Sequence, residues 1–261
     1  MEWETVRLEG TEAVRHIVLN RPRVHNAFNT RMLADLLEVV AAIEDEPRCR
    51  AVILRGEGPS FCAGADLKEG GVNHTAPLIA LMRRAKHGKE LRYRLGNMVP
   101  VTIAALHGHV IGRGVSLAGA CDFRIAADDA KLAISEVNVG LTINGFFGDV
   151  VNLVGLGRAR ELFILGETHP ADRMLAWGFY DQVVPRAELI PAAEALAARV
   201  EAQPPIPVQL TKQSINALAR SLDRALSHAN PAEFGLSARS TDGRLAREAR
   251  RSGVPPVWRF E

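Results

Sequence analysis

The sequence lacks the features that membrane-spanning and disulfide-bonded proteins require. No uninterrupted apolar run reaches the ~20 residues needed to cross a bilayer, and the N-terminal MEWETVRLEG has no apolar core of a signal peptide. The three cysteines, Cys49, Cys62 and Cys121, form no CxxC pair, so we expect reduced thiols and no disulfide framework. These absences predict a cytoplasmic protein that does not associate with membranes.

The sequence also has little excess charge of either sign. The formal net charge is +2, which indicates no particular charged partner. The basic stretch RLAREARR is better explained as a solvated helix face than as a nucleic-acid contact. His107 and His109 alternate near the end of a predicted strand rather than at metal-ligand spacing on a helix, so we expect no metal and no nucleic-acid partner.

The 261 residues show a repeating order of strands and helices. Residues 5–10 and 13–20 predict a hairpin, and residues 30–46 predict a helix that Asn29 or Thr30 can cap. Further strands are expected at 49–56, 99–106, 123–128 and 131–135. Helices are expected at 77–97, 113–121, 146–154 and 157–165, and almost only helix after Val184. Two or more strands followed by a helix, repeated, indicate an α/β fold built from ββα turns.

The stretch FCAGADLKE, residues 61–69, is the first candidate for chemistry. A strand leads into a loop in which Ala63, Gly64 and Ala65 precede a helix start. Backbone N–H groups at such a position favour negative charge through hydrogen bonding and the helix dipole. Taken alone, the loop fits an ordinary strand-to-helix turn equally well.

The stretch GHVIGRGVSLAGACDF, residues 108–123, supplies a second helix start behind a buried strand. Two separate helix N-termini can each direct one N–H at a single oxygen, which is the arrangement of an oxyanion hole. The glycine spacing fits neither a dinucleotide-binding fingerprint nor a P-loop. A serine hydrolase is also disfavoured, because Ser116 falls inside the helix rather than on the turn where a nucleophile elbow places its serine.

The third candidate is Glu136 in LAISEVNVGL, a carboxylate just after a strand in an otherwise apolar run. Such a carboxylate is either held in a structural ion pair or has a raised pKa suited to proton transfer. Among isolated buried carboxylates, the structural role is the commoner one.

Together these stretches resemble the enoyl-CoA hydratase/isomerase, or crotonase, family. The resemblance covers nearly the whole chain and includes LNRPRVHNAFNTRML, the CAGAD loop, LAGACDFRIAADDAK, SEVNVGL, GRARELFILGE, ADRMLAWGFYDQVVP and the Thr211–Lys212 pair. It implies a crotonase-like α/β spiral of ββα turns over residues 1–185, followed by a helical region, 186–261, that packs homotrimers or dimers of trimers. It also implies an acyl-CoA thioester as substrate, with coenzyme A as part of the substrate and no separate cofactor.

The resemblance assigns roles to individual residues. The backbone N–H groups of Ala65 and Arg113 would hold the thioester oxygen, and Glu136 would move the proton. Arg113 stands where the family has the middle glycine of three, and only its N–H is needed there. We expect its side chain to point outward along the surface; pointing inward, it would be able to pair with an acidic substrate.

A second departure concerns Ser116, at the position where the family's hydratases have the first of two glutamates. The loop residues Ala63, Gly64, Asp66 and Leu67 are expected to contact substrate. Ser135 and Asp149 are possible auxiliaries, Asp149 more as a structural residue. The acyl pocket is expected between residues 70–95 and the C-terminal helices, where no motif indicates chain length.

The simplest interpretation is an enoyl-CoA hydratase that acts through an enolate. A double-bond isomerase with one glutamate is the main alternative. A hydroxycinnamoyl-CoA hydratase-lyase is also similar at Ser116 and Glu136, but Val139 and Ala65 replace the tryptophan and methionine of that group. A non-catalytic relative that binds acyl-CoA or RNA is the alternative from another class.

Overall fold

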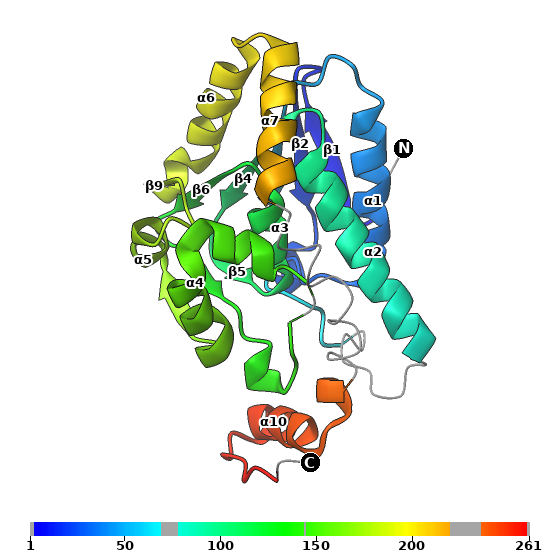
Figure 1. Cartoon of the computed structure of the whole chain (residues 1–261), viewed down its shortest axis with the longest axis vertical. Coiled ribbons are helices and arrows are strands. Elements are labelled where there is room, and N and C mark those ends of the chain that lie inside the picture. Colours follow the sequence, from blue (N-terminus) through cyan, green and yellow to red (C-terminus); the bar gives the residue numbers. More distant parts are fainter. Residues whose placement is uncertain (1–2, 69–77, 144, 220–235, 260–261) are drawn as a thin grey trace.

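The fold consists of two sheets, flanked by helices. A computed structural model describes residues 3–68, 78–143, 145–219 and 236–259 (Figure 1). The larger sheet has the order β1-β2-β3-β4-β6-β9, and the smaller has β5-β7-β8. The strands are β1 (Val6–Gly10), β2 (Val14–Leu19), β3 (Ala51–Gly56), β4 (Val101–Leu106), β5 (His109–Ile111), β6 (Phe123–Ala127), β7 (Lys131–Ala133), β8 (Thr168–Pro170) and β9 (Gln182–Val184).

The larger sheet is parallel apart from its first pair. β1 and β2 form the expected antiparallel hairpin, with Val6 opposite Leu19, and β2, β3, β4, β6 and β9 then pair in parallel. Each parallel step needs a crossover connection, and these connections supply the helices. The α/β spiral with two strands or more per turn is therefore confirmed.

Helices within the described residues include α1 (Thr30–Glu44), α2 (Leu78–Asn97), α3 (Arg113–Ala120), α4 (Phe147–Leu165), α5 (Ala171–Ala176), α6 (Leu189–Glu201), α7 (Pro205–Ala219) and α10 (Thr241–Ser252). Short 3-10 turns occur at η1 (Pro22–Val24), η2 (Val137–Val139) and η3 (Arg186–Glu188). Asn29 caps α1 as expected, since its side chain accepts a hydrogen bond of 2.8 Å from the Met32 N–H. α4 is kinked at Gly155, where φ is 75°.

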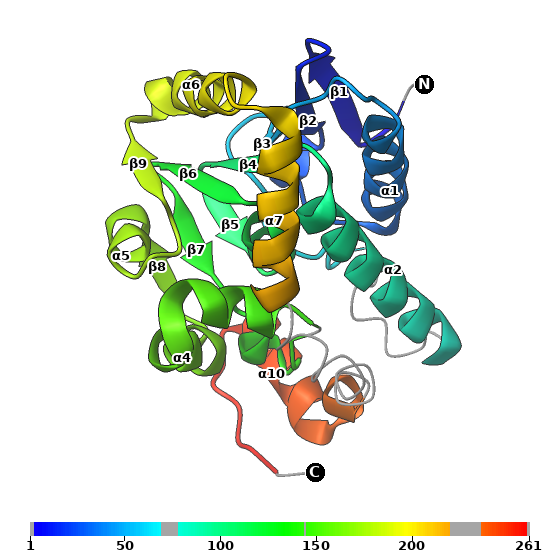
Figure 2. The same ribbon diagram turned by 45° about the horizontal axis from the view of Figure 1, so that its top comes forward.

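Residue alternation along the strands separates two apolar cores. On β3, Val52 and Leu54 face the core formed with α1, α3, α4 and the smaller sheet, whereas Ala51 and Ile53 face α6. Figure 2 shows α6 along one side of the larger sheet, with the smaller sheet and α4 on the other. Because a strand's side chains point alternately to its two faces, both faces of this sheet are covered.

α7 is held to the sheet by a buried ion pair. The Lys212 ammonium lies 2.6 Å from the Asp122 carboxylate and donates a 2.8 Å hydrogen bond to the Pro100 carbonyl. Asp122 in turn accepts hydrogen bonds from the N–H and hydroxyl of Thr102 on β4. The Thr211–Lys212 pair noted in the sequence thus joins α7 to β4.

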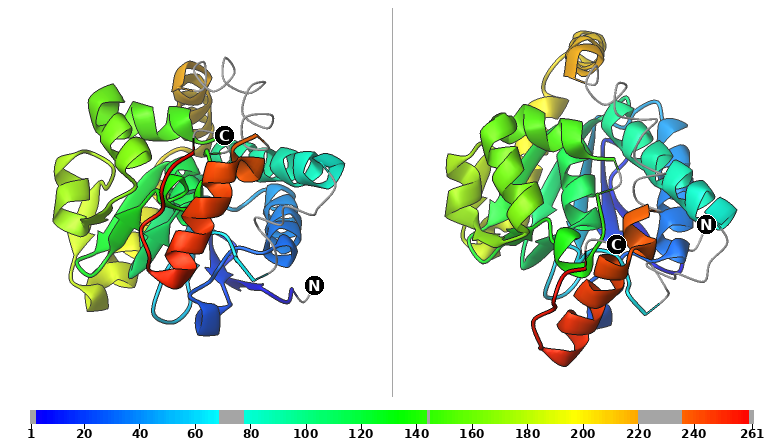
Figure 3. Two further views of the ribbon diagram at one scale, coloured as in Figure 1. Left: turned by 90° about the horizontal axis from the view of Figure 1, so that it is seen from below. Right: turned by 60° about the horizontal axis from the view of Figure 1, so that its bottom comes forward.

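α10 packs against η2, the turn that follows Glu136. Gly140 and Gly243 approach so closely that a Cβ on Gly140 would lie 2.3 Å from the Gly243 Cα. Arg247 reinforces the contact by donating a hydrogen bond to the Val139 carbonyl at 3.3 Å. Figure 3 shows α10, in red, at this end of the molecule. The division at residue 185 stays a prediction, although α6 packs directly on the larger sheet.

Candidate active site

The three stretches singled out from the sequence meet around one cavity of about 170 Å³. The loop after β3, the start of α3 and the segment after β7 each contribute to its wall. The described residues that line it are Ala63, Gly64, Ala65, Leu67, Ile111, Arg113, Ser135, Glu136, Val139, Leu141, Thr142, Phe146 and Arg250. Residues 70–77, part of the lining expected from the sequence, lie outside the described residues.

The local pairing of the first loop leaves the Ala65 N–H available. The Phe28 N–H donates to the Gly64 carbonyl at 2.7 Å, and the Asp66 N–H donates to the Phe28 carbonyl at 3.0 Å. In such a parallel bridge Phe28 bonds to the residues on either side of Ala65, and the N–H and carbonyl groups of Ala65 itself point away from Phe28. Ala65 therefore directs its N–H away from Phe28, and this N–H has no acceptor within the described part of the chain.

The second N–H belongs to Arg113, the first residue of α3. Helical bonding begins only at Ser116, whose N–H donates to the Gly112 carbonyl at 3.0 Å. The N–H of Arg113 precedes that point and has no intrahelical acceptor. Two N–H donors from different segments thus border the same cavity, as an oxyanion hole requires.

The glycines on either side of Arg113 have distinct structural reasons. Gly112 has a φ of 50°, and a Cβ there would lie 2.7 Å from Oε1 of Glu136. A Cβ on Gly114 would lie 2.7 Å from the carbonyl oxygen of Cys62. Gly112 therefore makes room for the Glu136 carboxylate, and Gly114 lets α3 approach the loop that carries Ala65. The position of Gly112 directly before a helix is visible in the sequence, but its contact with Glu136 depends on tertiary packing and was not predicted.

Glu136 has the environment of a proton-transfer group. Its Oε2 atom is buried and has no hydrogen-bond partner in the described part of the chain. Burial raises the pKa of this carboxyl above its ordinary value, and the charge of Arg113 only partly opposes the shift. The sequence left open whether Glu136 forms a structural ion pair or transfers protons. Among the described residues no cation forms an ion pair with Glu136.

We expected the Arg113 side chain to point outward along the surface, but in the structure it points inward. Its guanidinium lies 5.9 Å from the centre of the Phe28 ring and beside Gly88 of α2, where a Cβ would come within 2.8 Å of Nη1. Arg113 is also one of the residues that line the cavity containing Glu136. The outward orientation was wrong because α2 and Phe28 together form an inner slot for the long side chain, and neither contact is visible in the sequence.

The other predicted residues are distributed around this centre. Ala63, Gly64, Leu67 and Ser135 line the cavity. Asp66 forms an ion pair of 2.9 Å with Arg21 at the edge of the loop. The roles assigned to these residues stay predictions.

Ser116 and Asp149 lie apart from the cavity wall. Ser116 is buried on α3 and is not among the described residues that line the cavity. Asp149 forms an ion pair of 2.6 Å with Arg92, which agrees with the structural role favoured for it. The catalytic role of Ser116 stays a prediction.

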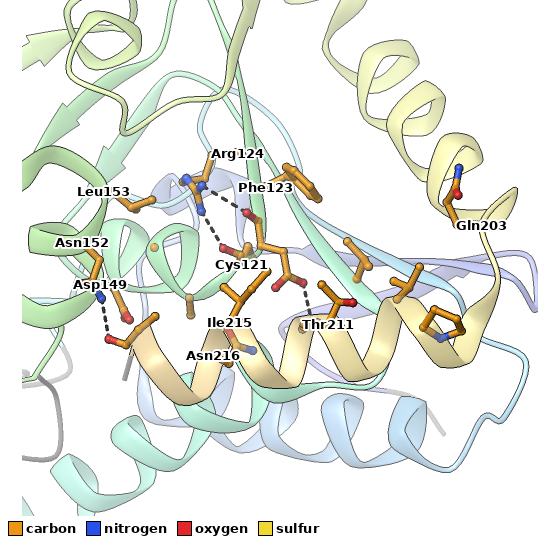
Figure 4. Close-up of a pocket in the computed structure, with 18 of the residues that line it drawn as sticks. Cys121, Phe123, Arg124, Asp149, Asn152, Leu153, Gln203, Thr211, Ile215 and Asn216 are labelled. Carbon is orange, nitrogen blue, oxygen red and sulfur yellow. Dashed lines mark hydrogen bonds and ion pairs between the residues drawn. The ribbon is translucent and has the colours of Figure 1, made fainter. Parts of the chain in front are cut away.

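A larger cavity, of about 610 Å³, lies between α7 and the α3–α4 region. Figure 4 shows Thr211, Ile215 and Asn216 on α7 facing the segment that contains Cys121 and Arg124. Charged side chains that line it already form ion pairs: Lys212 with Asp122, and Asp149 with Arg92 of α2. The smaller cavity, with a buried unpartnered carboxylate oxygen, is therefore the better candidate for chemistry.

The described residues contain neither a candidate metal cluster nor a candidate membrane-spanning helix. No group of three or more His, Cys, Asp or Glu side chains in them is placed to hold a metal ion. None of the helices within these ranges combines the length and apolar character of a membrane span.

Comparison with known proteins supports the same interpretation. Residues 9–250 match the family described as enoyl-CoA hydratase/isomerase. The chain is 35% identical over 239 residues to the short-chain-enoyl-CoA hydratase of Clostridium acetobutylicum, covering 90% of each protein. It is 34% identical over 248 residues to the crotonyl-CoA hydratase of Syntrophomonas wolfei, covering 93% of each.

The fold agrees with solved structures as well. A crystal structure of an enoyl-CoA hydratase/isomerase from Xanthobacter autotrophicus superposes with a TM-score of 0.88 at 29% identity, covering 97% of this chain and 95% of the other. The family match, the two relatives and the shared fold extend over the segments that build the cavity. The chain therefore belongs to the enoyl-CoA hydratase/isomerase family and is an enzyme of the enoyl-CoA hydratase type.

Proposed function

We propose that the protein adds water across the double bond of a short α,β-unsaturated acyl-CoA thioester. The observation that carries this proposal is the position of Glu136 on a cavity bordered by the N–H groups of Ala65 and Arg113. Within the described residues, one buried oxygen of Glu136 and both N–H groups have no hydrogen-bond partner. The names of the relatives from Clostridium and Syntrophomonas support a short acyl group. They also favour hydration over double-bond isomerisation, aromatic-substrate cleavage or a non-catalytic role.

The reaction follows from the charges that develop. As the oxygen of water bonds to Cβ, the π electrons of the double bond move toward the thioester oxygen, which gains negative charge. The N–H groups of Ala65 and Arg113 stabilise that charge, each contributing about 2.7–4 kcal/mol by comparison with other oxyanion holes. Glu136 takes a proton from the water and returns a proton to Cα, so the net change is the addition of one water molecule.

A single carboxylate is sufficient for this proton balance. Its raised pKa keeps the proton affinity of Glu136 closer to the working pH than that of an exposed glutamate. Ser116 replaces the first of the two glutamates of the family's hydratases and offers a hydroxyl in its place. We include Ala63, Gly64, Asp66, Leu67 and Ser135 as residues that shape the substrate site.

Coenzyme A enters as part of the substrate, and the proposed chemistry needs no metal or other cofactor. We further propose that the enzyme works in the cytoplasm as a homotrimer or a dimer of trimers. Support for assembly comes from α7, on which Ile206, Leu210 and Leu218 are more than half exposed, at 67%, 57% and 79%. Apolar side chains in such a row favour burial against another copy.

The first experiment follows the absorbance of the conjugated enoyl thioester with crotonyl-CoA and, separately, with a 3-enoyl-CoA. Hydration predicts loss of the signal from crotonyl-CoA. Appearance of the signal from the 3-enoyl substrate, with crotonyl-CoA unchanged, would establish the isomerase instead. Tight CoA-ester binding without turnover of either substrate would contradict both reactions.

Glu136→Gln is the matched variant for this assay. We expect kcat to fall about 10²- to 10⁴-fold, since the variant cannot transfer the proton. Because the folded-state pKa of Glu136 is raised, its ionised form costs stability above the ordinary carboxyl pKa, and the cost disappears as pH falls below that value. The variant should therefore unfold at a higher temperature than the wild type at neutral pH. Loss of activity together with lower stability would contradict this account.

A further inference from the structure

We infer that the Arg113 guanidinium binds a carboxylate on the acyl group, so that the preferred substrate is the CoA thioester of an unsaturated dicarboxylic acid. This inference rests on the proposed function and names its substrate class. It concerns the Arg113 side chain, whereas the oxyanion hole uses only the N–H of the same residue.

The first support is the position of the side chain. Arg113 lines the cavity with Glu136 and also lines a smaller adjoining cavity of about 60 Å³ beside Phe28 and Leu33. Its own N–H marks where the thioester oxygen binds, so its guanidinium lies within one side-chain length of the reacting group. Phe28 and Gly88 hold the guanidinium from two sides.

The second support is that no carboxylate of the described residues forms an ion pair with this cation. Within the described residues, the Arg113 guanidinium makes neither a hydrogen bond nor an ion pair. Its one cation–π contact among these residues is with the ring of Phe28. Burial lowers the pKa of the guanidinium, and the charge of Glu136 is the main carboxylate influence that opposes this. Arginine nevertheless stays protonated, so a partly buried positive charge with unused donors borders the substrate cavity.

The third support is the balance of charge around Arg113. Arg84 and Arg92 of α2 add to the positive field at this position. Arg92 is paired with Asp149, and Arg84 donates to the Thr30 hydroxyl at 2.7 Å. Glu136 cannot serve as the permanent partner of Arg113, because the proposed reaction uses its carboxylate for proton transfer.

A planar guanidinium with free N–H groups matches the geometry of a carboxylate, which it can bind through two parallel hydrogen bonds. A neutral alkyl group would leave the same donors buried and unpaired, which costs free energy. The site therefore favours an acyl group with a carboxylate over one of equal size without charge.

The test compares glutaconyl-CoA, which is crotonyl-CoA with a carboxylate on its terminal carbon, with the terminal amide of the same thioester. We expect the wild type to show a kcat/KM for the carboxylate about 10- to 100-fold above that for the amide. Arg113→Met keeps the backbone N–H and much of the side-chain length, and should bring the ratio of the two kcat/KM values close to one. Arg48→Met removes an exposed arginine and should leave the ratio as in the wild type.

Gly88→Ala provides a second variant that keeps the charge. Its methyl group would lie 2.8 Å from Nη1 of Arg113 and displace the guanidinium tip, whereas alanine is favourable in a helix. We expect the ratio to fall between those of the wild type and Arg113→Met, with no loss of thermal stability. Equal use of carboxylate and amide by the wild type, or a ratio unchanged in both variants, would overturn the inference.

Binding of saturated thioesters separates this inference from the proposed function. Glutaryl-CoA and its amide are compared by calorimetry, because neither has a double bond to hydrate. Selective, Arg113-dependent binding of glutaryl-CoA by a protein that hydrates no enoyl-CoA would contradict the hydratase proposal and support the carboxylate site. Hydration of crotonyl-CoA without any carboxylate selectivity would support the hydratase proposal and contradict the carboxylate site.

Discussion

At the scale of single residues, the active site depends on where side chains are missing. Arg113 lies between two glycines because the atoms on either side of it approach the backbone too closely for a Cβ. Gly112 contacts the Glu136 carboxylate, and Gly114 contacts the Cys62 carbonyl. Arg113 itself is tolerated because the proposed oxyanion hole uses only its N–H and because a slot beside Phe28 accepts its side chain.

Gly112→Ala is expected to lower both stability and activity. The added methyl group meets Glu136 Oε1 at 2.7 Å, at a backbone φ of 50°. We expect the variant to lose about 1–3 kcal/mol of folding free energy from backbone strain and at least about 10-fold in kcat from the displaced carboxylate. Urea unfolding and the crotonyl-CoA assay measure the two effects.

Gly155→Ala is the matched control, because Gly155 has a φ of 75° with no atom within 4 Å of the added methyl group. It should lose similar stability and keep its kcat. If both variants lose kcat equally, backbone strain and not contact with Glu136 would be the cause.

At the scale of elements, the donors lie on connections at the ends of neighbouring parallel strands. The loop after β3 carries Ala65, and the chain after β4 passes through β5 to the start of α3. The Phe61 and Cys62 N–H groups donate to the carbonyls of His107 and His109, at 2.8 and 2.9 Å, which joins the two connections. His107 adds a side-chain contact of 3.1 Å between Nε2 and the Gly58 carbonyl.

His107 makes the contact between the loop after β3 and the chain after β4 sensitive to acid. Burial lowers its pKa from 6.5 to about 4, so between these values the unfolded chain binds more protons than the folded protein. Stability from this group is complete above pH 6.5 and is lost as pH falls toward about 4, at a slope of up to about 1.4 kcal/mol per pH unit.

His107→Asn, which retains a hydrogen-bond donor but does not titrate, should remove this component. The measurement is the difference in urea midpoint between wild type and variant across that pH range. Parallel curves for the two proteins would show that His107 does not contribute to the acid sensitivity.

At the scale of the whole molecule, α7 is attached to the sheet on one side and exposed on the other. Its Lys212–Asp122 ion pair fixes the inner side, while Leu210 and Leu218 are exposed in the single chain. A helix anchored in this way presents its apolar row in a fixed orientation, as an interface between copies requires.

We therefore expect Leu210→Asp combined with Leu218→Asp to reduce the molar mass in solution from that of an oligomer to that of one chain. Leu175→Asp, at a leucine of α5 that is 41% exposed, serves as the control and should leave the mass unchanged. Light scattering coupled to size exclusion measures both. A monomeric wild type would contradict the proposed assembly, and an oligomeric double variant would place the interface elsewhere.

Local patterns in the sequence were sufficient to predict much of the fold. The β1–β2 hairpin, the cap on α1 and the strand–helix order depend on residue periodicity and turn residues, which act over a few positions. The short strands β5, β8 and β9, each of three residues, were not predicted, because their pairing partners lie far away in the sequence. β6 and β7 were predicted as strands, but only the tertiary pairing assigns them to different sheets.

The sequence by itself identified the candidate residues for the chemistry: the CAGAD loop, the glycine-rich helix start and Glu136, recognised through their order and their resemblance to one family. The tertiary structure decided what surrounds them. Three features depend on atoms that packing brings together from separate elements: the inward orientation of the Arg113 side chain, the contact of Gly112 with Glu136, and the lack of a described hydrogen-bond partner for Oε2 of Glu136. Spacing along a chain specifies local conformation, whereas burial and the absence of a partner are properties of packing.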